Sequence, residues 1–260
     1  MAERPEGFVG SDPLIREKLV RDGILEERGS REEKNGFDII LRYEKLWKNL
    51  KRRPSMIEVA LQGDVHPRVY LRSFGSWYAM HQEMEKRLGY RVIQESERRL
   101  YAEAGEFLAE IERTPMSLSY KMVVLSAWLN RDKGLSRPFA LREIAISFRE
   151  FFLDPFRRVD LEKTRIFNLD NVTNRMLESY LLGTRNVIRS LAGLDKREMS
   201  QSFFQYSPNS QELVYVGKGA SLDGFSEALR ERVIYRLFVY YQRVLAKKME
   251  CDRTFNHVKR

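Results

Sequence analysis

Guanidinium groups are the side chains of this sequence that most clearly suggest chemistry, and four of them lie close together. These are Arg52, Arg53, Arg68 and Arg72. The planar donor fork of arginine can bind a phosphate group or the O6/N7 edge of guanine. Carboxylates that could balance this charge are few between residues 39 and 75, namely Glu44, Glu58 and Asp64. We therefore predict that the four arginines contact a nucleic acid, through its phosphates or its base edges.

A second set of cationic and amide side chains is spread over the later part of the chain. We predict nucleic-acid contacts for Arg185, Asn186, Arg189 and Lys218. In the final predicted helix, residues 226–248, a narrow stripe at a period of 3.6 residues adds Arg232, Arg236 and Arg243. The same stripe is equally typical of a solvated basic face that keeps a protein soluble.

Catalytic and metal-binding patterns are absent or incomplete. The sequence has no Gly-x-x-x-x-Gly-Lys-Ser/Thr loop. Its single cysteine, Cys251, cannot form an internal disulfide, and with three histidines it does not make a Cys/His zinc cluster. We therefore expect no catalytic residues, no metal site and no cofactor.

One nuclease alternative stays open. Residues 215–218, Tyr-Val-Gly-Lys, resemble the second motif of the GIY-YIG nucleases, with Arg230 or Arg232 on the next helix and Glu250 as a metal ligand. The Gly-Ile-Tyr that this family requires is replaced by Phe-Gln-Tyr at residues 204–206. A β-hairpin ending at Gly217 explains the same residues without catalysis.

The elements that would position the first four arginines are short helices. Apolar residues recur at three and four positions over residues 39–50, which predicts an amphipathic helix. Pro54 precedes a helix opening at Ser55, and His66 and Pro67 open another. Gly75 and Ser76 form a chain stop followed by an N-cap, and Trp77 and Phe74 are expected in the core rather than stacked on bases. Short helices joined by tight turns indicate a helix-turn-helix module.

Residues 39–88 resemble the helical repeat found beside homing endonucleases and in some DNA helicases. The matching residues are Arg-Arg-Pro-Ser at 52–55 and Phe-Gly-Ser-Trp at 74–77. Lys51 stands where such repeats usually carry a small residue, and Leu-Gly-Tyr at 88–90 loosely follows their usual Ala-Gly-Leu ending. The resemblance implies a DNA-binding module.

A second helical domain is expected after a connecting helix at residues 92–113. Thr114 and Pro115 are predicted to start its first helix. Apolar stripes then fall at 120–127, 141–152 and 176–191, and residues 203–206 and 213–216 read as a two-stranded hairpin. Helices followed by one hairpin and a last helix predict a winged-helix-like domain.

Residues 114–245 also resemble a domain that follows the motor in certain bacterial superfamily-two helicases and restriction-type proteins. The resemblance rests on Thr-Pro-Met-Ser at 114–117, Phe-Arg-Glu-Phe-Phe at 148–152 and Tyr-Arg-Leu at 235–237. In the middle helix, Asn186 is followed by Val-Ile where the family usually shows Asn-Pro-Ile. It implies an auxiliary nucleic-acid or complex-forming part.

Composition agrees with a polyanionic partner. The 260 residues carry 46 Lys and Arg against 37 Asp and Glu, a formal net charge of +9 and a pI near 9.6. A mean hydropathy of −0.50 and the absence of a long apolar run exclude a membrane span, and the N-terminus lacks a secretory pattern, so a cytoplasmic protein is expected.

These observations predict a mainly α-helical protein with two helix-turn-helix modules. Its parts are a charged arm at 1–36 with a short helix at 12–27, the repeat at 37–91, the connecting helix at 92–113 and the winged-helix-like domain at 114–260. The alternative interpretation of the arm is a solvated leader. The predicted function is non-catalytic binding of double-stranded DNA, as an accessory or targeting component of a helicase, restriction or defence system. The alternative is a protein–protein adaptor in a larger helicase or nuclease assembly.

Overall fold

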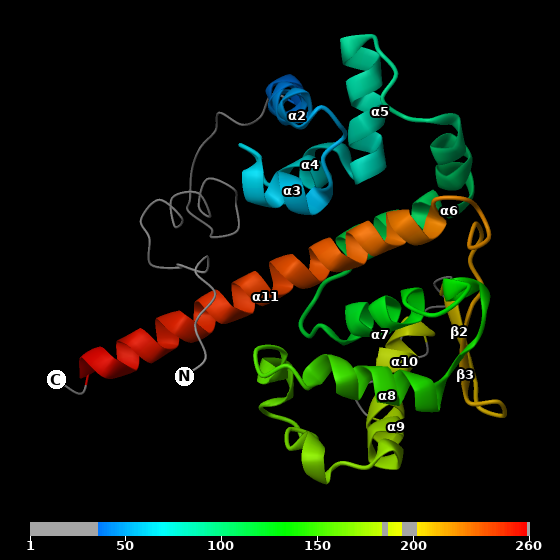
Figure 1. Cartoon of the computed structure of the whole chain (residues 1–260), viewed down its shortest axis with the longest axis vertical. Coiled ribbons are helices and arrows are strands. Elements are labelled where there is room, and N and C mark those ends of the chain that lie inside the picture. The colour runs from blue at the N-terminus through cyan, green and yellow to red at the C-terminus, as the bar shows by residue number, and fades with distance from the viewer. Residues whose placement is uncertain (1–35, 184–186, 194–201, 259–260) are drawn as a thin grey trace. The chain divides into compact units, whose positions relative to one another are not determined.

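The chain is mainly helical, with one small antiparallel sheet (Figure 1). A computed structural model describes residues 36–183, 187–193 and 202–258, and only the backbone of residues 36–37 and 249–258. The predicted charged arm and its helix at 12–27 lie outside the described residues. Contacts divide the chain into unit 1, the described residues up to Ile93 and from Phe238 on, and unit 2, Gln94–Leu237.

Unit 1 contains four successive helices, α2 (Gly36–Leu50), α3 (Met56–Gln62), α4 (Pro67–Phe74) and α5 (Trp77–Leu88). The turn between α4 and α5 follows the prediction. Gly75 ends α4 at φ 83°, a conformation that favours glycine, and the Ser76 side chain accepts a hydrogen bond from the Ala79 N–H.

Aromatic rings make the centre of unit 1. The Tyr43 ring meets those of Tyr70 and Trp77 edge to face at centroid distances of 5.8 and 5.5 Å. All three side chains are buried, and such edge-to-face pairs stabilise by about 0.5–1.5 kcal/mol each beyond their area burial. The expectation that Trp77 anchors the core is confirmed.

Unit 2 begins with α6 (Glu95–Arg113), which was predicted as a connecting helix. Its buried residues Leu100, Phe107 and Leu108 belong to the same core as α7 (Tyr120–Leu129), a helix buried on most of its faces. Residues Thr114 and Pro115 do not start a helix. Thr114 ends α6, with its N–H and its hydroxyl both donating to the Glu110 carbonyl.

The remaining helices of unit 2 surround this core. They are α8 (Leu141–Phe152), α9 (Asn174–Leu182), α10 (Val187–Leu191) and the first part of α11 (Phe225–Val258), with short 3-10 turns η2 (Gly134–Ser136), η3 (Arg157–Leu161) and η4 (Leu169–Asn171). The apolar stripe at 176–191 is thus two helices, because α9 ends at Leu182 and is capped by Gly183. The final helix runs ten residues farther than predicted, to Val258 rather than 248.

The predicted hairpin is present as β2 (Phe204–Ser207) and β3 (Glu212–Tyr215) (Figure 1). Each strand lies within one residue of its predicted position. A short strand that the sequence did not suggest, β1 (Phe139–Ala140), pairs antiparallel with β3, so β3 is central in the order β1-β3-β2.

Candidate nucleic-acid interface

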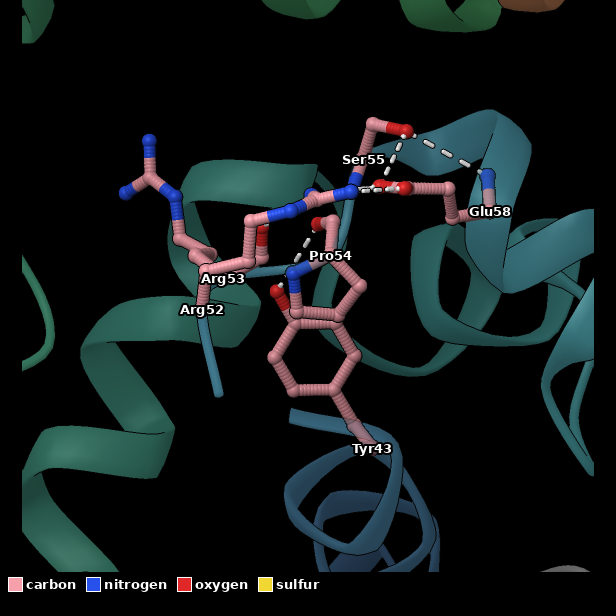
Figure 2. A network of polar contacts seen from close by, with 6 residues as sticks. All are labelled: Tyr43, Arg52, Arg53, Pro54, Ser55 and Glu58. Atoms are coloured by element: carbon pink, nitrogen blue, oxygen red, sulfur yellow. Dashed lines mark hydrogen bonds and ion pairs between the residues drawn. The ribbon is translucent and has the colours of Figure 1, made fainter. Parts of the chain in front are cut away.

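The segment that carries Arg52 and Arg53 is held in place by the core of unit 1. The buried Tyr43 hydroxyl donates to the Pro54 carbonyl at 3.3 Å (Figure 2). The same hydroxyl lies 2.9 Å from Nε2 of His81. Lys51, directly after α2, takes the left-handed conformation with φ 56°. The chain therefore leaves α2 through a sharp turn whose far end is fixed by a buried phenol.

Helix α3 begins with a capping box that was not among the expectations from the sequence. The Ser55 side chain accepts from the Glu58 N–H, and the Glu58 carboxylate accepts from the Ser55 N–H at 2.9 Å (Figure 2). The Ser-x-x-Glu spacing was the signal that would have revealed it.

Glu58 also binds Arg52, one of the predicted nucleic-acid ligands. The Arg52 Nη1 donates to Glu58 Oε2 at 2.9 Å, and Nη2 donates to Oε1. This bond, supported by those from Ser55 and opposed by burial, lowers the pKa of Glu58 to about 2. Arg52 thus already has an internal carboxylate partner, whereas the guanidinium of Arg53 extends away from that carboxylate (Figure 2).

Arg68 and Arg72 lie one turn apart on α4, so they share a face of that helix. Both are exposed, and neither forms an ion pair or side-chain hydrogen bond within the described part of the chain. The exposed side chain of Lys51 likewise forms no ion pair or hydrogen bond with the described residues. These cations are available to an external anion.

Each of the four carboxylates between residues 51 and 91 has a partner in the chain, and the pair of Asp64 with Lys45 lies on the surface. Glu58 pairs with Arg52, Glu83 with Arg87, and Asp64 with Lys45 at 3.7 Å. Glu85 accepts hydrogen bonds from the Val92 and Ile93 N–H groups at 2.7 and 2.6 Å. No carboxylate is therefore left over in this stretch to neutralise Arg68 and Arg72.

The prediction for Arg232 is wrong, because this side chain is buried inside unit 2. Residue Arg232 is 0% exposed, and its Nε donates to Glu112 Oε1 at 2.7 Å. Its Nη1 donates to the Ala228 carbonyl at 2.8 Å and its Nη2 to the Tyr101 hydroxyl. Burial raises the pKa of Tyr101 to about 12, so the phenol stays protonated and can accept this bond. A buried charge with this many partners is a structural element.

The predicted cationic stripe of the last helix is therefore broken. Arg236 is half-buried and donates to the Glu112 carbonyl at 2.8 Å and to the Thr114 carbonyl, at the end of α6. Arg243 is exposed, with its guanidinium 5.6 Å from the centre of the Tyr240 ring. Of the three predicted ligands on this helix, Arg243 is the one whose side chain is exposed.

Two other predicted residues of unit 2 are exposed. Arg189 lies on α10, and Lys218 follows β3. The predicted ligands Arg185 and Asn186 lie outside the described residues.

Both arginines proposed for the nuclease alternative form hydrogen bonds within the protein. Besides the buried Arg232, Arg230 donates to the Leu129 carbonyl and to Asn130 Oδ1, both at 2.7 Å. Among the described residues, no three His, Cys, Asp or Glu side chains are grouped as metal ligands would be.

Comparisons with protein-family models, with curated proteins and with solved structures found no match. No helix in the described ranges has the length and apolarity needed to cross a bilayer.

Proposed function

We propose that the chain is a non-catalytic DNA-binding protein that contacts duplex DNA through α4 of unit 1. The observation that carries the proposal is that the arginines of this helix lack carboxylate partners in the ranges that the structure describes. Arg68 and Arg72 are exposed and share one face without an ion pair among the described residues, while each carboxylate from residue 51 to 91 has a partner in the chain.

The local fold supports the proposal as well. Helices α3, α4 and α5 follow one another through turns fixed by side-chain caps at Ser55, His66 and Ser76. Short helices joined in this way suit a helix-turn-helix reading, in which one helix enters the major groove. Lys51 and Arg53, in the turn before α3, would then bind phosphates beside the groove.

A titration of the full chain with a fluorescent duplex at several salt concentrations tests the proposal. Anisotropy should show binding that weakens steeply with salt, because each phosphate contact releases counterions. Replacing both Arg68 and Arg72 with Ala should flatten the slope of log K against log salt by about two.

The matched control is Lys86→Ala with Arg87→Ala, which removes the same charge from α5, where both side chains lie near Glu83. This control should leave most of the slope intact. If the slope falls equally in both variants, binding is due to general charge attraction and not to a site on α4. Binding that is absent or independent of salt would contradict DNA binding altogether.

A second candidate function, a subunit that docks onto another protein, is favoured by exposed apolar side chains of unit 2. Leu153, Phe156, Phe167 and Met176 are between 46% and 60% exposed and lie within one stretch of the chain. Large exposed apolar side chains are enriched where proteins bind each other. In this reading the chain would be an accessory component of a larger helicase, restriction or defence assembly, and binding to DNA would be weak without its partner.

A further inference from the structure

A second place in the molecule has the chemistry of an anion site, and it lies wholly within unit 2. A pocket of about 300 Å³ opens between the segment that precedes β1 and the loop that follows β3. Its walls include Ser136 and Arg137 on one side and Gly217, Gly219 and Ser221 on the other.

The loop on the far side is held in one conformation by steric and polar contacts. A Cβ at Gly217 would lie 2.4 Å from the Tyr215 ring, so a larger residue there would have to displace that ring. Gly219 has φ 82°, and a Cβ there would lie 2.9 Å from that of Ala104. The Tyr215 hydroxyl donates to the Lys218 carbonyl at 3.0 Å, and the Ser136 hydroxyl donates across the pocket to the Ala220 carbonyl at 3.2 Å.

The same loop leaves hydrogen-bond donors unused. None of the five backbone N–H groups from Gly217 to Ser221 donates to another group of the described chain. Successive backbone N–H groups in a glycine-rich loop form a concave site for anions, as in phosphate-binding loops. These residues are half-buried or exposed, so water or a ligand can accept from their amides.

The charge of the pocket has a single sign. Arg137 is its only charged lining residue, it is exposed, and its side chain has no ion pair among the described residues. Lys218, also exposed, stands between two lining glycines. Within the described part of the chain, no carboxylate lines the pocket.

We propose that this pocket binds a phosphate group, with the Arg137 guanidinium and the amides of residues 217–221 as its donors. A guanidinium fork matches two phosphate oxygens, and the loop amide N–H groups can donate to the third. The phosphate can belong to a nucleic-acid backbone or be a free anion. The inference does not depend on DNA binding by α4, because no residue of unit 1 takes part.

Amide NMR spectra of the full chain, titrated with inorganic phosphate against sodium chloride of equal ionic strength, test the proposal. The amide signals of residues 217–221 should shift and saturate with phosphate and stay in place with chloride. Arg137→Gln should weaken this binding about tenfold, the loss of roughly 1.4 kcal/mol expected for one charged contact, and Arg137→Lys should weaken it less.

The matched control is Arg175→Gln, an exposed arginine on α9 that does not line the pocket. It should bind phosphate as the unchanged protein does. Substitution of the Arg137 side chain leaves its carbonyl, which accepts from the Trp128 indole N–H at 2.9 Å, so the fold should survive. Unchanged dispersion of the other amide signals would verify this.

A second titration with a short DNA duplex separates the two sources of phosphate. Shifts of the same amides that are reversed by excess phosphate would identify a backbone contact. Shifts with inorganic phosphate alone would identify a free anion. The proposal is overturned if neither probe shifts these amides beyond the chloride control, or if Arg137→Gln leaves the shifts unchanged.

Discussion

Individual arginines have opposite roles in this protein, and a comparison of three from unit 2 with two from unit 1 shows it. In unit 2, three guanidinium groups donate inward: Arg236 to carbonyls at the end of α6, Arg230 to one at the end of α7, and Arg158 to one at the end of α8. A cation at the C-terminus of a helix satisfies orphan carbonyls and complements the helix dipole. In unit 1, Arg68 and Arg72 have no such partner among the described residues and remain in solvent.

This difference shows that the net charge of a protein does not tell how much positive charge is exposed for binding. The net charge of +9 includes the buried Arg232, which contributes nothing to an exposed patch. Two arginines of equal basicity become a structural clamp or a candidate ligand according to which acceptors lie within reach. Substitutions of both kinds of arginine and of their neighbours should therefore have effects of different size.

The largest effect is expected from Arg232→Met, which leaves Glu112 buried without its cation. Loss of one partner of a buried ion pair costs about 3–5 kcal/mol of the free energy of unfolding. Denaturant unfolding measures it, with the exposed Arg175→Met as control. The double variant with Glu112→Leu should recover much of the loss, since an apolar pair can replace a buried ion pair. A cost below about 1 kcal/mol would deny Arg232 its structural role.

Acid should destabilise unit 1 through His66. Burial, and less strongly the charge of Arg68, lower the pKa of His66 from 6.5 to about 4. The unfolded chain therefore binds a proton between these values that the folded chain rejects. The contribution of neutral His66 to the free energy of unfolding is fully present above pH 6.5. It is lost as the pH falls toward 4, by up to about 3 kcal/mol.

The variant His66→Asn tests this cause, because asparagine can still accept from the Arg68 N–H as an N-cap but does not titrate. Unfolding experiments across this pH range should show a flatter profile in the variant. An unchanged profile would assign the acid sensitivity to other groups.

A smaller loss is expected from Arg149→Met in unit 2. The Arg149 guanidinium donates to the Leu169 carbonyl at 2.6 Å and to the Val172 carbonyl. Loss of these charged hydrogen bonds should cost about 2 kcal/mol. Arg142→Met on the same helix is the exposed control and should change the free energy of unfolding little. Arg149→Lys should rescue only part, because an ammonium lacks the planar fork.

The smallest effect is a gain in stability from Lys51→Gly. A non-glycine residue in the left-handed region costs about 1 kcal/mol, which glycine avoids. Lys51→Ala keeps the Cβ and is the control, expected to gain nothing. If Lys51 binds phosphate, both variants should weaken duplex binding equally while only the glycine variant is more stable.

Local structure was largely predictable from the sequence. The helix starts at Ser55, His66 and Ser76 and the stop at Gly75 depend on neighbouring residues, and each is found where its residue type indicated. The β2–β3 hairpin was predictable for the same reason. Thr114 was misread because a threonine before proline can as well end one helix as begin another, and α6 already extends to Arg113.

The amino-acid sequence by itself determined the helices of unit 1, their caps and the grouping of arginines around Pro54. Only the tertiary structure decided which guanidinium groups face solvent. Glu112 and Arg232 are 120 positions apart, and periodicity cannot reveal a partner at that separation. The physical reason is that the residue type alone fixes the charge of a side chain. Whether that side chain can bind an external anion depends on the acceptors that folding brings within hydrogen-bond distance.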